Sequence, residues 1–598
     1  MTASLDMWLI GNCQVSALID RSGAFVWGCV PRVDGDPAFS ALLNGKANKD
    51  DDASGFWSVE LEDCMSVEQH YHRNTPVLIS RHTDAAGNSI DVVDFCPRVH
   101  RADRTYRPVA FVRIIRPVSG SPRITMRLRP TQEYGKQIAN RTFGSNHIRY
   151  LLPLYGLRLT TNAAVSMVEE ERSFRVEKPL YFFLGPDEPF AGDFATSLEH
   201  MLADTIADWQ IWVRGLATPV EWQEAVIRAA ISLKLCQHEE TGAIVAAITT
   251  SVPEHANSQR NWDYRYCWIR DAYYTVQALN RLGALDVLEG YLGYLRNIVD
   301  AAKGGLIQPL YGVLGETRLE ERVADCLSGY RGTPPVRVGN EAYKQVQHDA
   351  YGQIVLSNVQ AFFDHRLLRP AGIADFEALE KVGEHAWNLH DKPDAGLWEL
   401  RTRTAIHTYS AAMCWAACDR LANAARALGL EDRRTFWSDR AATIREHIEK
   451  AAWRPEQKTM SATFDGDALD ASLIQLLDLR FFAPDDPRFR GTMEAVEAGL
   501  RRGSYMLRYT TEDDFGLPAT AFNVCTFWLI EALYVTGRSD DARELFEEML
   551  SRRTAAGLLS EDIDPATGEL WGNYPQTYSL VGLINCAVLL SRPWGAVR

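Results

Sequence analysis

The stretch ATAFNVCTFWLIEALYVTG at 519–537, followed by SDDARELFEEMLSR at 539–552, decides the fold of the second half of the chain. The first stretch is apolar on nearly every side, which is typical of a helix that is buried all round. The second has one strongly charged face, which is typical of a helix at the surface. Together they predict an inner helix joined by a short turn to an outer helix that covers it.

Helical spacing of apolar residues recurs throughout the chain after about residue 217, and it marks twelve amphipathic stretches. They lie near 220–237, 269–283, 285–302, 348–366, 375–391, 407–428, 433–452, 467–480, 488–502, 519–537, 539–552 and 576–592. Twelve helices in one domain favour an (α/α)6 barrel, in which six inner helices stand inside six outer ones. An α-solenoid is the alternative, but the sequence has no repeat of fixed period.

Residues 1 to about 200 have a different pattern, because short runs of alternating apolar and polar residues are separated by Gly, Asp, Asn and Pro. Examples are ALIDRSGAFVWGCV (17–30), SIDVVDFCP (89–97), YRPVAFVRIIRPV (106–118) and LRLTTNAAVSMVEEERSFRVE (157–177). Strands this short and numerous predict a large antiparallel β-sandwich. We therefore expect a β-sandwich domain over 1–205, a linker over 206–219 and a helical barrel over 220–598.

The composition narrows the class of partner. The chain has 598 residues and a net charge of −15, which argues against a nucleic-acid or anionic-membrane partner. The N-terminus, MTASLDMWLIGN, lacks the features of a secretory signal, and no apolar run is long enough for a membrane span. The 11 cysteines form no CxxC pair and no zinc-type cluster with histidine. We expect a cytoplasmic protein with reduced thiols and no metal; the sequence does not indicate an oligomeric state.

Six long connections alternate with the predicted helix pairs, so a barrel would gather them at one end. They lie at about 238–268, 303–347, 391–406, 452–466, 503–518 and 553–575, and they are rich in Gly, Pro, Trp, Tyr and acidic residues. Long loops on a rigid scaffold often carry the chemistry of an enzyme. Aromatic rings and carboxylates at one rim suit a sugar, whose apolar faces stack on rings and whose hydroxyls need polar partners.

Two of these connections each contain a candidate catalytic acid. In DAGLWELRTR (394–403), Glu399 follows Trp398, and a carboxyl beside an indole is desolvated and stays protonated, as a general acid requires. The alternative is a simple ion pair between Glu399 and Arg401. In GLLSEDIDPATGELWGNYPQ (557–576), Glu561 lies in an apolar run, where its carboxylate could activate a water. The alternative is that the acids of this loop cap the helix that begins near Gln576.

Other connections contain candidate substrate-binding residues. RNWDYRYCWIRDA (260–272) places Arg270 and Asp271 at a helix start, where they could bind sugar hydroxyls by charge-assisted hydrogen bonds. The alternative is a surface ion pair in which Asp271 is the N-cap. In QPLYGVLGE (308–316), Glu316 is either a substrate contact or a solvated acid. In RYTTED (508–513), Arg508 could bind a hydroxyl, and Glu512 or Asp513 would balance its charge.

Taken together in their order, these blocks resemble glycoside hydrolase family 15, in its bacterial glucoamylase and trehalase branch. The resemblance covers nearly the whole chain. It rests on IGNCQVSALIDRSGAFVWGCVPRVDGDPAF near the N-terminus, on RNWDYRYCWIRDA as the most specific block, and then on YGVLGE, LSGYRGTPPVRVGNEAYKQVQHDAYG, GLWELR, LDASL, RYTTED and GNYPQTYSLVGLI. Two departures stand out. The segment Leu517–Phe522 lacks the Gly-Glu-Gly found in many relatives, and Cys13 replaces a smaller residue.

The resemblance implies a super-β-sandwich followed by an (α/α)6 barrel, and a reaction that inverts the anomeric carbon without metal or organic cofactor. It implies that Glu399 is the general acid and Glu561 the general base. Arg270, Asp271 and Arg508 match positions that bind the non-reducing glucose, and Trp268, Trp398 and Glu316 are expected in the same pocket. Trp27 and the loop 31–36 either contribute to the pocket rim or belong to the sandwich core and a turn.

The expected function is therefore an exo-acting α-glucoside hydrolase that acts on small α-linked glucosides. Trehalose is the favoured substrate, because a cytoplasmic enzyme would encounter it. Maltooligosaccharides, as for a glucoamylase, and isomaltose are the alternatives. A glycoside phosphorylase is a more distant alternative, since it would replace the base carboxylate with an anion site. A sugar-binding protein derived from an enzyme would have lost one of the two acids, and both are present.

Overall fold

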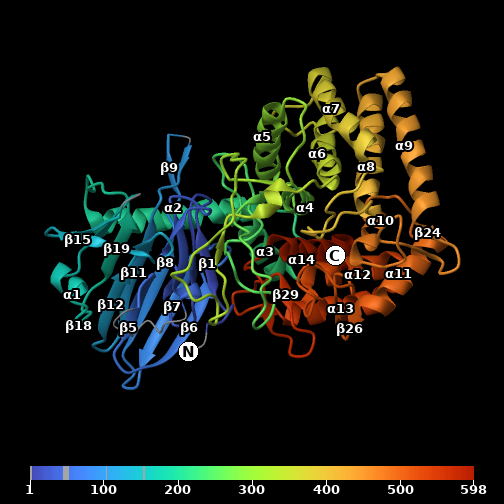
Figure 1. Ribbon diagram of the computed structural model, residues 1–598. Helices are drawn as coiled ribbons and strands as arrows, with labels where there is room; N and C mark the ends of the chain where they lie inside the picture. The colour runs from blue at the N-terminus through green and yellow to red at the C-terminus, as the bar shows by residue number, and fades with distance from the viewer. Residues whose placement is uncertain (1–2, 45–52, 103, 153–154, 598) are drawn as a thin grey trace.

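The computed structural model of the chain describes residues 3–44, 53–102, 104–152 and 155–597. Figure 1 shows two parts side by side, one built of strands in blue and cyan and the other of helices in green to red. The expected antiparallel sandwich followed by a helical barrel is confirmed. A long helix, α2 (Phe194–Arg214), runs along the strand-rich part.

All pairs of neighbouring strands in the two large sheets are antiparallel. One sheet has the order β1 (Trp8–Gly11), β2 (Ser16–Ile19), β3 (Phe25–Val30), β5 (Phe56–Leu61), β12 (Arg123–Arg129) and β18 (Phe174–Arg175), with β4 (Asp36–Phe39) paired to β3. The other has the order β15 (Asn140–Phe143), β16 (His147–Leu151), β17 (Gly156–Thr161), β19 (Leu180–Gly185), β11 (Phe111–Ser119), β8 (Ser89–Phe95), β7 (Leu78–Asp84) and β6 (Cys64–Tyr71).

The sequence of β11 shows why the sheets pack as they do, because successive side chains of a strand point to opposite faces. Phe111 points into the sandwich, where its ring lies 5.6 Å from that of Phe39 on the facing sheet. Val112 and Ile114 point to the opposite face and pack in one cluster with Leu198 of α2. Helix α2 therefore covers the outer face of this sheet.

This helix corrects one expectation from the sequence. Residues 206–219 were expected to link the two domains, whereas α2 continues to Arg214 and only the residues after it, up to the next helix, form a connection. The buried residues Leu198, Leu202, Thr205, Trp209 and Val213 form a stripe at helical spacing, and Thr205 is its one polar member. That stripe was not recognised in the sequence. The domain boundaries themselves remain a prediction.

Six inner segments form a closed ring, in which each contacts the next and the last contacts the first. In order they are α4 (Ile269–Arg281), α6 (Asp349–Val359), α8 (Thr408–Ala427), η4 (Ala471–Ile474) with α10 (Gln475–Asp478), α12 (Asn523–Val535) and α14 (Thr577–Leu590). The outer helices that cover them are α3 (Gln223–Leu235), α5 (Leu285–Ala302), α7 (Ile373–Leu389), α9 (Glu431–Ala452), α11 (Pro487–Leu500) and α13 (Ser539–Ser551). Each of the twelve predicted stretches therefore contains a helix.

The neighbouring helices α12 and α13 have the burial patterns that their sequences predict. In α12, every residue from Asn523 to Ile530 is buried, as in a helix packed on all sides. In α13, the buried residues are Ala542, Leu545, Phe546 and Met549, which lie on one face at helical spacing. The stretch 467–480 is shorter than expected, because the Asp470 side chain accepts a hydrogen bond from the Ser472 amide and so begins the helical segment only at Ala471.

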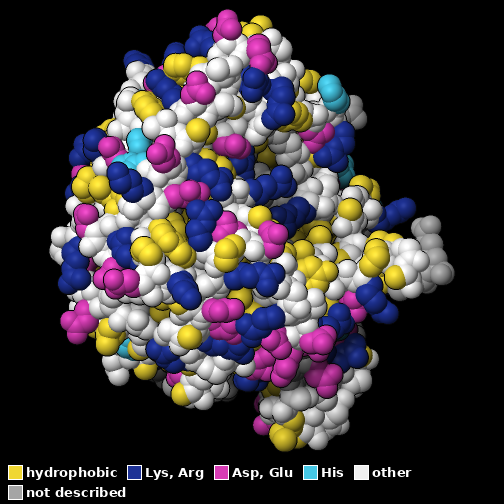
Figure 2. Space-filling model, turned by 90° about the vertical axis from the view of Figure 1, so that its right-hand side faces the viewer, with side chains coloured by type: hydrophobic (Ala, Val, Ile, Leu, Met, Phe, Trp, Pro, Cys, Tyr) yellow, Lys and Arg dark blue, Asp and Glu magenta, His cyan; other side chains and the backbone are white. Residues whose placement is uncertain are grey.

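The surface agrees with the charge composition. Figure 2 shows acidic and basic side chains interspersed over one face of the molecule. A continuous basic surface, which a nucleic acid would need, is not visible on that face. Among the described helices, none is both long and apolar enough to cross a membrane.

Candidate active site

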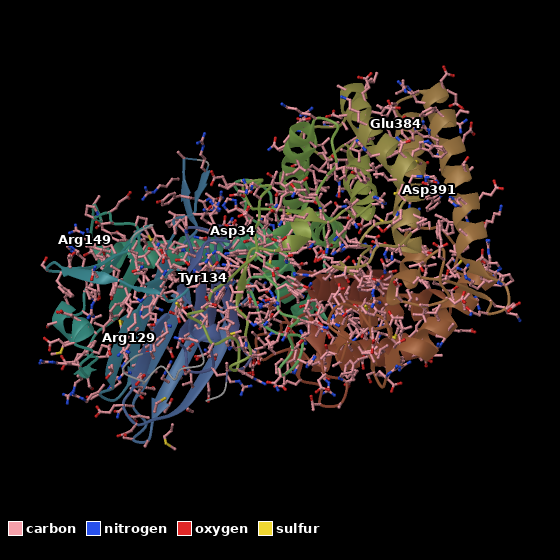
Figure 3. All side chains as sticks on the ribbon, viewed as in Figure 1. Asp34, Arg129, Tyr134, Arg149, Glu384 and Asp391 are labelled. Carbon is pink, nitrogen blue, oxygen red and sulfur yellow. The ribbon has the colours of Figure 1, made fainter. Side chains whose placement is uncertain are left out.

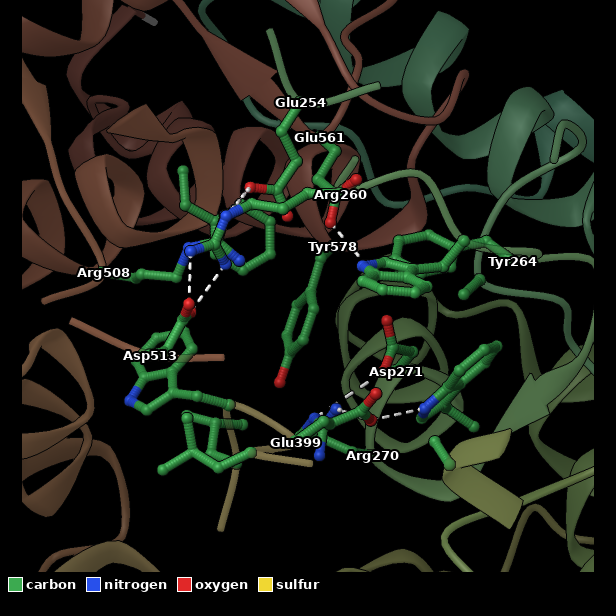
Figure 4. Close-up of a pocket in the computed structure, with 18 of the residues that line it drawn as sticks. Glu254, Arg260, Tyr264, Arg270, Asp271, Glu399, Arg508, Asp513, Glu561 and Tyr578 are labelled. Atoms are coloured by element: carbon green, nitrogen blue, oxygen red, sulfur yellow. Dashed lines mark hydrogen bonds and ion pairs between the residues drawn. The ribbon is translucent and has the colours of Figure 1, made fainter. Parts of the chain in front are cut away.

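A pocket lies where the connections between outer and inner helices meet the N-terminal ends of the inner helices (Figure 4). Its lining residues from these connections include Glu254, Tyr264, Gln345, Trp398, Glu399, Arg508 and Glu561, and those at inner-helix starts include Arg270, Asp271 and Tyr578. The N-terminal end of a helix has partial positive charge, so carboxylates are favoured near these ends. The fold thus brings together residues that are more than 300 positions apart in the sequence, such as Glu254 and Glu561.

Glu399 is held in the pocket by both its backbone and its carboxylate. Its backbone is left-handed, with φ of 58°, which costs a residue other than glycine about 1–2 kcal/mol. The Glu399 amide donates to the Gly396 carbonyl at 3.2 Å, and Gln345 Nε2 donates to the Glu399 carbonyl at 3.1 Å. Glu399 Oε1 accepts hydrogen bonds from Trp268 Nε1 at 2.6 Å and Arg270 Nη2 at 2.9 Å. These contacts fix the position of the carboxylate.

Glu561 is held by a small sheet. It immediately precedes β29 (Asp562–Ile563), which lies between β28 (Ala521–Phe522) and β30 (Leu570–Trp571). The Glu561 amide donates to the Asn573 carbonyl at 3.2 Å, and the Glu561 carbonyl accepts from the Asn523 amide at 3.0 Å. Its Oε1 accepts a hydrogen bond from the Tyr264 hydroxyl at 2.6 Å, and the residue is only 2% exposed.

Two aromatic residues connect the supports of the two acids. Tyr264 donates to Glu561, Trp268 donates to Glu399, and the two rings meet edge to face with centroids 5.4 Å apart. Figure 4 shows Glu399 and Glu561 on opposite sides of the pocket. Each carboxyl group is therefore anchored to one ring, and the two rings pack against each other.

Glu561 belongs to a group of three buried carboxylates. One oxygen from each of Glu254, Glu561 and Asp562 lies within 4.8 Å of the others. Burial, followed by repulsion from Glu254, raises the pKa of Glu561 to about 8, and the same two causes raise the pKa of Asp562. Three carboxylates this close could share a divalent cation. The Arg508 guanidinium supplies positive charge at the same place, because it contacts Glu254 and lies 4.0 Å from Asp562 Oδ1.

Arg270 and Asp271 are buried in the pocket and do not form the surface pair that was the alternative. Besides its bond to Glu399, Arg270 donates from Nη1 to Gln347 Oε1 at 2.9 Å. Burial raises the pKa of Asp271 to about 7, partly offset by Arg270, whose Nε lies 3.8 Å from it. The N-cap of α4 is Trp268, so Asp271 does not cap the helix.

Trp398 lies in the pocket wall beside Glu399. Its Nε1 donates to Asp470 Oδ2 at 2.8 Å, and its ring packs against Tyr509 and Trp528 with centroid distances of 5.8 and 6.3 Å. The ring is therefore oriented by a buried carboxylate behind it. A fixed indole at this position can stack against the apolar face of a sugar.

The structure does not bring Glu316 into the pocket. Glu316 is not among the described residues that line the pocket. Glu316 Oε1 instead lies 3.3 Å from Arg32 Nη2, its Oε2 accepts from the Leu314 amide at 2.9 Å, and its side chain is 41% exposed. The expectation from the sequence is therefore wrong on this point, since the loop turns Glu316 toward the sandwich domain.

The sandwich domain supports the pocket without lining it. Trp27 is fully buried and its Nε1 donates to the Ile248 carbonyl at 2.8 Å, so it belongs to the interface between the two domains. In the loop 31–36, Arg32 pairs with Asp34, and the described lining residues include no member of this loop. The contribution of this domain is indirect: buried Arg265, next to Tyr264, donates to Tyr134 Oη at 2.6 Å and to the Gly35 carbonyl at 2.7 Å.

Arg508 has a different acidic partner from the one expected from the sequence. Glu254, and neither Glu512 nor Asp513, balances the charge of Arg508. Asp513 instead binds Arg260, with 2.6 Å between Oδ2 and Nη1.

In the described part of the chain, Glu399 forms no ion pair with Arg401. The guanidinium of Arg401 instead pairs with Glu321, with 2.9 Å between Nη2 and Oε2. The acids around Glu561 do not cap α14 either, since the Gln576 side chain accepts from the Ser579 amide and caps it.

The altered segment Leu517–Phe522 forms part of the support of Glu561. Ala521 pairs with Ile563 across β28 and β29, and Thr520 Oγ1 donates to Asp562 Oδ1 at 3.3 Å. Phe522 contributes its ring to the pocket, whereas Leu517 is 57% exposed. This side of the pocket therefore presents an aromatic ring.

Some site residues had no distinguishing signal in the sequence. Tyr264 lies in the block RNWDYRYCWIRDA, but the spacing alone does not show which of its aromatic residues contacts an acid. Glu254 lies in VPEH, where nothing separates it from an ordinary loop acid. Tyr578 lies in the first turn of α14 and reads as a core residue of an apolar helix. Each of these three can be identified as a site residue only in the folded structure, where the connections between the helices meet at the pocket.

Comparisons with known proteins agree with this architecture. A sequence profile of glycosyl hydrolases family 15 matches residues 221–588, and a profile of the trehalase-like N-terminal domain matches residues 5–150. A trehalase of Mycolicibacterium smegmatis is 30% identical, with 98% of this chain and 91% of that protein covered. A trehalase of Thermoplasma volcanium is 29% identical, with 97% of this chain and 92% of that protein covered.

A crystal structure of a bacterial glucoamylase complexed with acarbose has the same fold over both domains. It covers 98% of this chain and 94% of its own, with a TM-score of 0.69 and 12% sequence identity. At that identity the likeness concerns the fold alone.

Proposed function

Because the chain belongs to glycosyl hydrolases family 15, we propose that this glycoside hydrolase is an exo-acting, inverting trehalase with Glu399 as general acid and Glu561 as general base. The observation that carries the proposal is the pair of carboxyl groups on opposite sides of one pocket. The choice of trehalose over other α-glucosides is supported by the likeness to trehalases over nearly the full chain.

The proposed reaction inverts the configuration at C1. Inverting glycosidases have carboxyl groups about 6.5–9.5 Å apart, which leaves room for a water between base and sugar. In this reaction the Glu399 carboxyl donates its proton to the glycosidic oxygen as the bond to C1 breaks. Glu561 removes a proton from the water that attacks C1 from the opposite face. Tyr264 holds the Glu561 carboxyl group and Trp268 holds the Glu399 carboxyl group, each by one hydrogen bond.

In this proposal, charged residues between the two acids bind the terminal glucose. Arg270, Asp271 and Arg508 are buried, so their hydrogen bonds to sugar hydroxyls form in a largely desolvated site and are strong. Trp268 and Trp398 offer ring faces and edges to the apolar side of the sugar. A buried network of this kind rejects sugars that cannot satisfy each polar group.

Release of glucose from trehalose, maltose and isomaltose under identical conditions tests the substrate. We expect the highest kcat/KM for trehalose, without a requirement for phosphate as second substrate. Cleavage of maltose or isomaltose in preference to trehalose would keep the mechanism and replace the substrate. Formation of glucose 1-phosphate would instead favour a phosphorylase, against which the buried Glu561 in the pocket argues.

The anomers released from trehalose provide a test of the stereochemistry. Inversion at one C1 converts that glucose to the β anomer, while the leaving glucose keeps its α configuration. We expect proton NMR, recorded before mutarotation, to show α- and β-glucose in equal amounts. Release of two α-glucose molecules would mean retention and would contradict the assignment of Glu561 as base.

The pH dependence should reflect the three buried carboxylates. Glu561 must be ionised to act as base, and its pKa is raised to about 8, so kcat/KM should fall as the pH drops from mildly alkaline values toward 6. Because the carboxylates interact, the apparent pKa of this acidic limb belongs to the group and not to one residue. An acidic limb near pH 4.5, the ordinary value for glutamate, would contradict this prediction.

Replacing Glu254 with glutamine should move the acidic limb to lower pH by about one unit or more, because a negative charge beside Glu561 is removed. It also frees Arg508 to interact with Glu561 and Asp562, which lowers the pKa further in the same direction. The matched control is Glu316→Gln, which removes an acid that the structure places outside the pocket. The control should leave the pH profile unchanged.

We also propose a cytoplasmic location. The support for it is the state of the buried cysteines, because all nine of them carry free thiols: Cys13, Cys29, Cys96, Cys236, Cys267, Cys414, Cys418, Cys525 and Cys586. A protein that works in an oxidising compartment more often uses its cysteines in disulfides. Cell fractionation with antibody detection of the native protein tests the location directly.

A further inference from the structure

We propose that His390, Asp391 and His447 form a binding site for one zinc-like divalent transition-metal ion, separate from the active site. His390 is the C-cap of α7, Asp391 follows it, and His447 lies in α9. One donor atom from each of the three residues lies within 4.8 Å of the others. Figure 3 shows Asp391 in the helical part of the molecule. Helices α7 and α9 are neighbours there, since Arg440 of α9 pairs with Glu384 of α7 at 2.7 Å.

The hydrogen bonding of His390 prepares it as a ligand. Its Nδ1 lies 2.6 Å from the Trp387 carbonyl oxygen, which can only accept, so Nδ1 carries the proton. The lone pair is therefore on Nε2, and Nε2 faces His447. A second hydrogen bond that fixes the tautomer and orientation of the ring is the usual arrangement for a metal-bound histidine.

The distance between the two histidines matches a metal site. His390 Nε2 and His447 Nδ1 are 3.4 Å apart, with the rings nearly perpendicular at 89°. Two ligands bound tetrahedrally to zinc at about 2.0–2.1 Å are about 3.3–3.4 Å apart by geometry. The present separation of these two nitrogens therefore equals the separation that two zinc ligands require.

Asp391 supplies the third ligand after a rotation of its side chain. At present its carboxylate pairs with Lys392 Nζ at 3.0 Å, and both side chains are at least one-third exposed. An exposed pair of this kind is weak, so a divalent ion can displace the lysine. Two imidazoles and one carboxylate suit zinc and its neighbours in the first transition series, whereas magnesium and calcium prefer oxygen ligands alone. Water completes the tetrahedron.

The position of the site gives it a structural role. It would join the end of α7 to α9 at the start of the connection that carries Glu399. That connection is also held by Asp394, whose carboxylate accepts from the His348 amide and from Ser410 Oγ, both at 2.8 Å. A metal ion would be a further anchor on the same segment, so we expect it to raise thermal stability more than kcat.

Zinc titration of the full chain, without an affinity tag and after dialysis against a chelator, tests the proposal. Calorimetry and metal analysis should find one ion bound per chain, with an increase in the apparent unfolding temperature. Cobalt should give the intense visible absorption of a tetrahedral complex. His447→Gln should weaken binding by about 10–100-fold or more, because a ligand is lost. Lys392→Ala should strengthen it, because the competitor for Asp391 is removed.

Two controls separate this site from other binding. His200→Ala removes an exposed histidine of α2, distant from the cluster in sequence and domain, and should leave the affinity unchanged. The double variant His390→Gln and His447→Gln should lose the bound ion while keeping glucose release from the metal-free enzyme. Equal zinc binding by the double variant and the unaltered protein would overturn the proposal. So would an absence of binding at about 100 µM zinc.

Discussion

Replacement of Glu561 with glutamine is expected to lower kcat for trehalose by about 10²–10⁴-fold, the usual contribution of a general base. The amide has nearly the same shape as the carboxylate, so it can keep the hydrogen bond from Tyr264 Oη while losing the capacity to take a proton from water. KM should change little, because in the proposed mechanism Glu561 contacts the attacking water and not the hydroxyls that position the sugar. Steady-state kinetics with glucose detection measure both parameters.

Glu569→Gln is the matched control for this variant. Glu569 lies in the same connection, eight positions further along the chain, and its exposed carboxylate pairs with Arg331 at the surface. The same chemical change there should leave kcat within about twofold, in line with a surface substitution. A similar kcat for Glu561→Gln and Glu569→Gln would show that Glu561 is not the base.

Replacement of Glu399 with glutamine is expected to lower kcat for trehalose by a similar factor of about 10²–10⁴, but the loss should depend on the leaving group. Glucose is a poor leaving group and needs a proton, which Glu399 supplies if it is the general acid. Fluoride leaves without one, so α-glucosyl fluoride should be hydrolysed by this variant at a rate much closer to that of the unaltered enzyme. Kinetics with both substrates measure the difference.

The contrast between the two variants identifies the roles of the acids. Glu561→Gln should be impaired on both substrates, because each reaction needs an activated water. Glu399→Gln should be impaired mainly on trehalose. If Glu399→Gln loses the same factor on α-glucosyl fluoride, then Glu399 does not act as the acid. Its contacts with Trp268 and Arg270 would then have only a structural meaning.

Residues outside the pocket also help to position one of the two acids. Arg265 is fully buried, pairs with Asp263 at 2.7 Å and reaches Tyr134 in the sandwich domain, while its neighbour Tyr264 binds Glu561. The orientation of Glu561 therefore depends in part on a domain that does not line the pocket. The barrel provides both acids, and the sandwich domain contacts the residue next to one of their supports.

The sequence by itself determined the elements of the fold. Apolar spacing such as that of α13 is a local property of the chain, so all twelve barrel helices could be located from it. Alternation in β11 likewise identified the strands. The stripe of α2 was missed because Thr205 interrupts it and because the helix follows directly on strand-rich sequence.

The order of the sequence motifs also identified seven site residues, and the structure brings all of them into one pocket. They are Glu399, Glu561, Arg270, Asp271, Arg508, Trp268 and Trp398. The tertiary structure alone decided which charges meet. Glu254 pairs with Arg508 and Glu316 with Arg32, across 254 and 284 positions respectively. Such pairs depend on the closing of the helical ring and on its contact with the sandwich domain. Electrostatic interactions act through space over a few ångströms, and local sequence carries no record of those distances.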